Sequence, residues 1–198
     1  MTGICAIFST FAAASEANEN LNDMDLSGKK VLVAYFSHTG ENYAVGVIEK
    51  GNTHIIAEMI AEAVGGELFE IEPARRYPHS YNDCIAAARR EKEAGARPAI
   101  AADIEAESYD VIFIGYPNWW GEVPMCVYTF LEKHDWSGKT VIPFCTHEGS
   151  GLSGTERSVA AACPGASVKK GLAVKGTTAQ HEPARAREAV GAWLGKLQ

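Results

Sequence analysis

The sequence predicts an α/β protein of one domain, in which helices cover both faces of a parallel β-sheet. Apolar, β-branched segments alternate with amphipathic helical segments from residue 29 onward, a pattern typical of a parallel sheet with crossover helices. The apolar segments are hydrophobic throughout, as expected of strands that are buried on both faces. Because crossover connections are right-handed, an open three-layer sandwich is the simplest arrangement.

Five segments have the composition of buried strands. The first is a run of apolar residues that ends at Ser37, and the second is shorter. The third contains the sequence DVIFIGYP and the fourth the sequence TVIPFC, both rich in β-branched and aromatic residues. The expected strands are residues 30–37, 67–73, 109–117, 139–146 and 166–174.

The segments between these strands have apolar residues at helical spacing. After the first strand, a stripe that includes Ile56, Met59 and Ile60 predicts a helix that ends at Gly65-Gly66. Pro164-Gly165 closes a later helix in the same way. The expected helices are residues 52–66, 80 or 81 to 94, 123–134, 153–165 and 182–197.

Composition limits the classes of partner. The chain has 198 residues, of which 46% are hydrophobic and 22% charged, with a net charge of −7. This charge, without any cluster of Lys or Arg, disfavours nucleic acid as a partner, and no apolar run approaches the roughly 18 residues of a membrane span. The five cysteines never form C-x-x-C and the six histidines lack ligand spacing, so we expect reduced thiols and no metal site.

The amino-terminal segment differs from the rest of the chain. Residues 1–28 hold four acidic and no basic residues, whereas residues 29–198 hold 21 acidic and 18 basic residues. The stretch ICAIFSTFAAA resembles the apolar region of a secretory leader with cleavage after Ala14, but no basic residue precedes Lys29. We therefore expect residues 1–28 to be an arm before a domain of residues 29–198, able to contribute to a homodimer. We expect a cytoplasmic protein, with export as the alternative if the leader acts.

In parallel sheets of this kind, ligands bind where the strands end. The first strand is followed by SHTG, by the eleven-residue stretch 41–51 and by Asn52-Thr53 at a helix start. Hydroxyls, exposed amides and a helix amino terminus suit a phosphate dianion, although the same side chains also cap helices. The segment lacks the glycine patterns of NTPase loops and of dinucleotide-binding turns.

The third strand is followed by two adjacent tryptophans, Trp119 and Trp120, between Pro117-Asn118 and Gly121. Indoles offer broad faces for stacking on an aromatic ligand, which stabilises a complex by about 1 kcal/mol beyond area burial. The alternative is that an indole fills the core under the following helix. We expect this of one of the two, because the pair lies in a loop.

The fourth strand is followed by THEGSGLSG, in which the glycines allow close backbone approach to a planar group. His147 and Glu148 are candidates for an acid–base pair, but we favour the interpretation that they are exposed side chains of a glycine-rich turn. Together the three loops provide a phosphate cradle, an aromatic clamp and a glycine-rich rim. This combination suits a phosphorylated flat ring such as flavin mononucleotide (FMN).

Three segments together resemble the flavodoxin-like FMN proteins, and within them a bacterial subgroup with a Pro-Asn-Trp-Trp loop. These segments are AYFSHTG followed by GNTHIIAEMI, DVIFIGYPNWWG followed by VPM, and GKTVIPFCTHEGSG. The resemblance covers residues 29–198. It implies a five-stranded flavodoxin-like sheet in the order 2-1-3-4-5, FMN as cofactor, and a short-chain member without a long insertion in the fifth strand. No side chain is assigned as a catalytic nucleophile.

The resemblance also implies a role for each loop. The first loop would hold the phosphate, the second would flank the isoalloxazine ring with one Trp stacked on it, and the third would border the pyrimidine end. The implied phosphate-binding residues are Ser37, Thr39, Gly40, Asn52 and Thr53 with the backbone of His38; the ring is flanked by Pro117, Asn118, Trp119, Trp120 and Gly121, and bordered by Thr146, His147, Glu148, Gly149, Ser150 and Gly151.

Residues 41–51 depart from the family pattern, in which Thr-Gly leads directly into Asn-Thr. Glu41 is expected to point away from a phosphate, because like charges repel. Asn42 or Lys50 is a candidate for an added phosphate contact, and Tyr43 is a candidate for a lid over the flavin. An insertion without function is the alternative.

The expected function is electron transfer by an FMN-binding redox protein to or from a partner protein. The alternative is an NAD(P)H-dependent FMN oxidoreductase of the quinone reductase type that acts on a small acceptor. The weak net charge of residues 29–198 favours this alternative, because electron carriers gain from electrostatic steering. A flavin-free binding protein of the same fold is a third hypothesis, against which the hydroxyls of the first loop argue.

Overall fold

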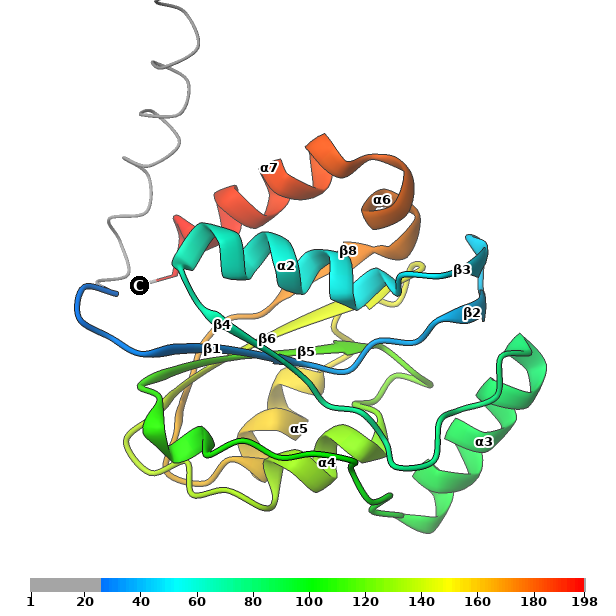
Figure 1. The fold of residues 1–198 in the computed structure, drawn as a ribbon, viewed down its shortest axis with the longest axis horizontal. Helices are drawn as coiled ribbons and strands as arrows, with labels where there is room; N and C mark the ends of the chain where they lie inside the picture. The colour runs from blue at the N-terminus through cyan, green and yellow to red at the C-terminus, as the bar shows by residue number, and fades with distance from the viewer. Residues whose placement is uncertain (1–25, 198) are drawn as a thin grey trace, which may run out of the picture.

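The computed structural model describes residues 26–197, so the expected arm or leader of residues 1–28 lies almost entirely outside the described residues. The described chain forms a three-layer α/β/α sandwich around a parallel sheet (Figure 1). The strands of this sheet are β1 (Val31–Tyr35), β4 (Glu67–Glu70), β5 (Val111–Pro117), β6 (Thr140–His147), β7 (Ser167–Val168) and β8 (Leu172–Lys175). Their order, β4-β1-β5-β6-β7, is 2-1-3-4-5 when the main strands are counted, so the predicted flavodoxin-like fold is confirmed.

Helices lie on both sides of the sheet (Figure 1). One side carries α2 (Asn52–Val64), α6 (Gly176–His181) and α7 (Pro183–Leu194), and the other carries α3 (Tyr81–Ala94), α4 (Met125–Leu131) and α5 (Thr155–Ala162). Three elements were not expected: α6, the 3-10 turn Ala106–Ser108, and an antiparallel hairpin of β2 (Gly40–Asn42) and β3 (Gly46–Ile48). Each is too short to show a hydrophobic period in the sequence.

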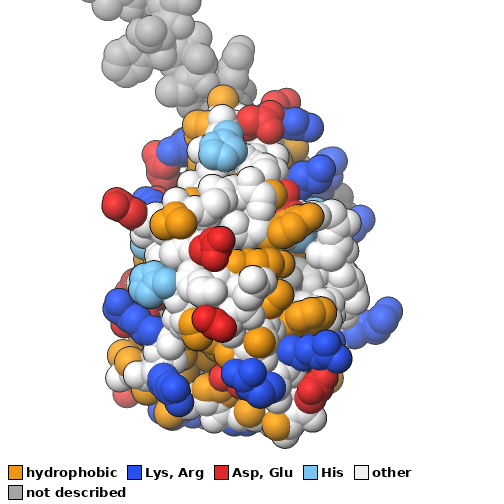
Figure 2. All heavy atoms as spheres, turned by 90° about the vertical axis from the view of Figure 1, so that its right-hand side faces the viewer, with side chains coloured by type: hydrophobic (Ala, Val, Ile, Leu, Met, Phe, Trp, Pro, Cys, Tyr) orange, Lys and Arg blue, Asp and Glu red, His pale blue; other side chains and the backbone are white. Residues whose placement is uncertain are grey.

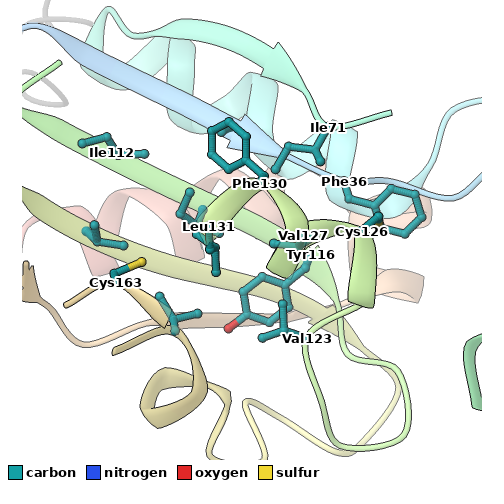
Figure 3. Packing of buried hydrophobic residues seen from close by; sticks show 14 of the residues in the cluster. Phe36, Ile71, Ile112, Tyr116, Val123, Cys126, Val127, Phe130, Leu131 and Cys163 are labelled. Atoms are coloured by element: carbon teal, nitrogen blue, oxygen red, sulfur yellow. The ribbon is translucent and has the colours of Figure 1, made fainter. Parts of the chain in front are cut away.

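Two hydrophobic clusters, one on each face of the sheet, hold the layers together. Leu32 belongs to the cluster on the α4 side and Val33 to the cluster on the α2 and α7 side, because successive side chains of a strand point to opposite faces. Figure 3 shows the first cluster, in which Tyr116 of β5 and Phe130 of α4 are fully buried. Burial on both faces is the reason that the strands are hydrophobic throughout.

The fifth strand is interrupted by a β-bulge. Val168 and Leu172 are four positions apart in the chain. The β6 residues with which they pair, Val141 and Phe144, are only three positions apart. Pro143 of β6 lies in this stretch and has no amide hydrogen to donate. Its carbonyl oxygen lies so near Gly171 that a Cβ on Gly171 would be only 2.9 Å from it. The expected single strand of residues 166–174 is therefore two short strands, β7 and β8.

The cysteines among the described residues carry free, buried thiols. The cysteines Cys84, Cys126, Cys145 and Cys163 are free and buried, and burial raises the pKa of each thiol to about 12. Within residues 26–197, no cluster of three or more side chains is arranged to hold a metal ion. No helix in this part of the chain is both long and apolar enough to cross a bilayer.

The close packing of the central strands predicts the effect of enlarging Gly115. A Cβ at this position in β5 would lie 2.2 Å from Cζ of Phe144. We expect Gly115→Ala to lower the free energy of unfolding by about 1–3 kcal/mol, as overpacked cores do, in urea denaturation. In the control Gly191→Ala, the new methyl enters open space in α7 and should leave stability unchanged or raise it by up to about 1 kcal/mol. Wild-type stability of the Gly115 variant would contradict the tight contact.

Candidate functional site

A cavity of about 280 Å³, called the main cavity below, lies at the carboxyl ends of β1, β5 and β6. Ligands bind at this edge in open α/β sheets. Figure 2 shows this end of the molecule, where hydrophobic side chains gather over the middle of the surface. The predicted site residues that line the main cavity are His38, Asn42, Asn52, Pro117, Asn118, Trp119, Trp120, Thr146, His147, Glu148 and Ser150. Those that do not are Ser37, Thr39, Gly40, Thr53, Gly121, Gly149 and Gly151.

The amino terminus of α2 reaches the main cavity through a close approach of two backbone segments. A Cβ at Gly51 would lie 2.1 Å from Oγ of Ser37 and 2.7 Å from the His38 carbonyl oxygen, so only glycine fits. The Ser37 hydroxyl accepts a hydrogen bond from the His54 amide at 3.0 Å. The helix begins with the amides of Asn52 and Thr53, which have no hydrogen-bond acceptor within the helix. This terminus is therefore suited to an anion.

Ser37 and Thr39 line a second cavity of about 350 Å³, and His38 borders both cavities. The carboxylates that line the second cavity are those of Glu49, Glu70 and Glu72. Arg76, His54 and His79 also line this cavity, so it holds both acidic and basic side chains. Ser37 and Thr39 thus line a different cavity from Asn52.

Thr146 joins the three loops. Its hydroxyl lies 2.8 Å from the hydroxyl of Thr53, and both side chains are buried. Its carbonyl oxygen accepts a hydrogen bond from the Asn118 amide at 2.8 Å, while Nδ2 of Asn118 donates to the carbonyl oxygen of Gly151 at 2.7 Å. These bonds tie the start of α2, the tryptophan loop and the glycine-rich loop to one another.

The two tryptophans have different surroundings. Trp119 is partly buried, packs against the core and meets the ring of Tyr77 edge-on, with centroids 4.9 Å apart. Because it also lines the main cavity, the prediction that one indole fills the core holds in part. Trp120 remains 48% exposed. Trp120 and Gly121 have φ of 57° and 72°, in a tight turn closed by backbone hydrogen bonds between Trp119 and Glu122. A tryptophan in the left-handed region is strained.

His147 and Glu148 each bond to the backbone around them. Nδ1 of His147 accepts from the amides of Gly149 at 2.8 Å and Gly151 at 3.1 Å, and burial lowers the pKa of this imidazole. The Glu148 carboxylate accepts from the amide and the hydroxyl of Thr177, at 2.6 and 3.1 Å, at the start of α6. These bonds shape a turn and cap a helix, which favours the structural interpretation over an acid–base pair.

The stretch of residues 41–51 folds into the β2–β3 hairpin and continues into α2. The Glu41 carboxylate accepts a hydrogen bond from the Tyr81 amide at 2.9 Å, so it caps α3. Lys50 forms an ion pair with Glu58, which engages its ammonium group on α2. Of the two candidates for an added phosphate contact, Asn42 alone lines the main cavity.

Two polar atoms of residues that line the main cavity are buried without a hydrogen-bond partner. They are Nε2 of His38 and Oδ1 of Asn118. A buried polar atom without a partner destabilises a fold by about 1–3 kcal/mol, so a ligand that pairs with these atoms would recover that energy. Burial, and to a lesser extent the charge of His79, lowers the pKa of His38 to about 4. Its neutral ring can donate or accept at Nε2.

Three residues of α3 that were not singled out from the sequence also line the main cavity: Tyr81, Cys84 and Ile85. Their spacing places them on one face of the helix, and this signal was present in the sequence. Which way that face points depends on how α3 packs, so the spacing alone did not assign them to the site. Gly51 was missed because it falls at the end of the stretch that departs from the family pattern.

Comparison with known proteins identifies relatives of this chain. Residues 30–194 match the model of the flavodoxin family. No match was found among the curated proteins. Two solved structures of proteins provisionally named flavoproteins, from Bacteroides eggerthii and Bacteroides uniformis, are each 34% identical, with TM-scores of 0.66 and 0.65. The matches cover 84% and 85% of this chain and 96% and 99% of those chains.

A third solved structure is a flavoprotein in complex with FMN from Lactobacillus acidophilus. It is 22% identical, with a TM-score of 0.58, over 79% of this chain and 99% of that chain. At this identity, the match shows a common fold.

The buried imidazole of His38 predicts a pH dependence of stability. In the unfolded chain a histidine has a pKa of about 6.5, whereas burial lowers the pKa of His38 to about 4 in the folded protein. As the pH falls, the unfolded state takes up this proton first, so the free energy of unfolding should decrease between about pH 6.5 and pH 4.

Urea denaturation at several pH values checks this expectation. His38→Gln should lack this part of the pH dependence, whereas His181→Gln, a change at an exposed position, should retain it. The same slope in His38→Gln as in the wild type would show that the imidazole is not held in its neutral form.

Proposed function

The chain belongs to the flavodoxin family, and we propose that its domain of residues 29–198 binds FMN in the main cavity and transfers electrons through it. The observation that carries this proposal is that an anion-binding helix terminus and two indoles border one cavity: Asn52 at the start of α2 lines it together with Trp119 and Trp120. FMN needs both features, because it joins a phosphate to a flat aromatic ring. The FMN complex of the Lactobacillus acidophilus relative, which has the same fold, supports the proposal.

The donor and acceptor set of the cavity fits this cofactor. A flavin ring carries an N–H donor and carbonyl acceptors along its pyrimidine edge. Oδ1 of Asn118, an acceptor without a partner, suits the donor, and Nε2 of His38 suits an acceptor or a donor. At the other end, the absence of a Cβ at Gly51 lets Ser37 and the His38 carbonyl group lie close to the start of α2.

We assign the phosphate end to the loop after β1 and to the start of α2, where His38 borders both the main cavity and the second cavity. Thr146 can donate its proton to the Thr53 hydroxyl, since either oxygen of this pair can be the donor, and this leaves the Thr53 proton for an anion. The proposed phosphate-binding residues are Ser37, His38, Thr39, Gly40, Asn42, Asn52 and Thr53. The proposed ring-binding residues are Pro117, Asn118, Trp119, Trp120, Gly121, Thr146, His147, Glu148, Gly149, Ser150 and Gly151.

Bound FMN supplies the electron chemistry, and the side chains around it set its reduction potential. Glu41 and Glu148 line the main cavity, and no Lys or Arg of residues 26–197 does so. This lining disfavours the negative charge that a flavin gains on reduction, so we expect a low potential. The Pro-Asn-Trp-Trp loop and the short interruption of the fifth strand support assignment to the short-chain bacterial subgroup.

A second function, reduction of a small acceptor with NAD(P)H, is favoured by the exposed rings beside the cavity. Tyr43 is 63% exposed and Trp120 48% exposed, and such ring surface offers a stacking face to a flat acceptor. Anaerobic addition of NADH or NADPH to the FMN-loaded protein separates the two functions. Loss of the flavin absorbance would support the enzyme, and an unchanged spectrum would support the carrier.

The phosphate assignment predicts the effect of removing two hydroxyls. We expect Thr39→Val combined with Thr53→Val to weaken FMN binding by about tenfold or more, because two hydrogen bonds of about 1 kcal/mol each are lost. Fluorescence titration of the apoprotein with FMN measures this. Thr39→Ser with Thr53→Ser keeps both hydroxyls and should bind as the wild type does. Thr140→Val, at the opposite end of β6, should also be neutral. Unchanged affinity in the double valine variant would refute the assignment.

A further inference from the structure

The hairpin is fastened to α3, and together they form one wall of the main cavity. The Glu41 amide donates to the His79 carbonyl oxygen at 2.8 Å, and the Glu41 carboxylate accepts from the Tyr81 amide at 2.9 Å. The ring of Tyr43, in the hairpin turn, lies against the ring of Tyr81, with centroids 5.9 Å apart and planes at 33°. Tyr43 is thus held in place although 63% of it is exposed.

Trp120 is held on the same helix by three contacts. Its indole N–H donates to the Ile85 carbonyl oxygen at 3.0 Å, and the Lys92 ammonium group donates to the Trp120 carbonyl oxygen at 2.7 Å. The Arg89 guanidinium group lies 5.5 Å from the centroid of the indole ring. These contacts keep Trp120 in a left-handed conformation, with φ of 57°, and leave almost half of it exposed.

Ordered but exposed rings indicate a surface suited to a flat ligand. Fixing a side chain has an entropic cost that burial normally offsets, and here burial is incomplete for both Tyr43 and Trp120. Both residues line the main cavity together with Tyr81. Aromatic surface of this kind is stabilised when a second flat ring covers it.

The charged side chains that line the cavity limit the charge that a bound ring can carry. Among the described residues the cavity lining contains the carboxylates of Glu41 and Glu148 but no Lys or Arg. Of the cations on α3 that contact Trp120, Arg89 pairs with Glu93 at 2.8 Å and Lys92 bonds to the Trp120 carbonyl oxygen. An acceptor that carries phosphate or sulfonate groups would meet two carboxylates in the cavity lining and no Lys or Arg, whereas an uncharged ring needs no counter-ion.

We propose that Tyr43, Tyr81 and Trp120 form a binding site for an uncharged quinone beside the flavin, with Tyr43 as the residue that determines specificity. The proposal rests on the proposed function, because the quinone is the acceptor of electrons from reduced FMN. One quinone takes up two electrons and two protons, and its two carbonyl oxygens become hydroxyls. One fully reduced FMN supplies both electrons and both protons and returns to its oxidised form.

Equilibrium binding of menadione, an uncharged naphthoquinone, to the oxidised FMN-loaded protein tests the site without turnover. We expect Tyr43→Ala to weaken menadione binding at least about fivefold, since one of the three rings is lost, and Tyr43→Phe to bind within about twofold of the wild type. Val47→Ala is the matched control: Val47 lies in the same hairpin, is 79% exposed and does not line the cavity. It should bind menadione as the wild type does.

The FMN content of each sample, read from its absorbance, separates the two levels of the proposal. A wild-type protein that does not retain FMN would overturn the proposed function and the quinone site with it. A loaded wild type that fails to bind menadione, or that prefers anthraquinone-2-sulfonate to menadione, would overturn the quinone site alone. Equal binding of menadione by Tyr43→Ala and by the wild type would overturn the role of Tyr43. So would a loss of FMN from Tyr43→Ala, which would place Tyr43 on the flavin.

Discussion

The hydrogen bond between the buried hydroxyls of Thr53 and Thr146 is the contact on which the geometry of the site depends. The two oxygens are 2.8 Å apart, and the bond joins the start of α2 to the end of β6 across the cavity edge. Because Thr146 also accepts from the Asn118 amide, one residue fixes the relative positions of all three loops. A helix terminus and an aromatic loop that come from distant parts of the sequence thus border the same cavity, without a metal cluster or disulfide among the described residues to hold them.

The wall of the main cavity that the hairpin and α3 form carries two exposed rings, those of Tyr43 and Trp120. The hairpin and α3 are joined by hydrogen bonds of Glu41 and by the contact between Tyr43 and Tyr81, and α3 holds Trp120 by its indole, its carbonyl group and its ring face. Strain and unpaired groups concentrate around the main cavity: a left-handed tryptophan, a buried imidazole nitrogen and a buried amide oxygen. Such features cluster where a protein is shaped for a ligand rather than for its own stability.

The fold could be predicted because each main element has a local cause. The continuous apolar runs that become β1, β5 and β6 are buried on both faces, and the helical stripe of α2 faces the sheet, so composition and period already contain this information. The fifth strand was predicted as one segment and forms two, because the bulge arises from a contact between Gly171 and Pro143 of a neighbouring strand. The hairpin was missed because three-residue strands carry no period, and its register is set by pairing within the hairpin and by α3.

For the site, the sequence alone determined which loops lie at the carboxyl edge of the sheet, because the alternation of strands and helices makes the strands parallel and so brings their carboxyl ends to one edge. The strand order came from the resemblance to the flavodoxin-like proteins. It also supplied the residue types, including the indoles, the hydroxyls and the glycines. Only the tertiary structure decided which of these face one another. It placed Trp119 against the core and Trp120 against α3, put Thr39 in the lining of a second cavity, and bonded Glu41 and Glu148 to helix termini. The direction of a side chain depends on packing against residues far away in the chain, and no local pattern contains that contact.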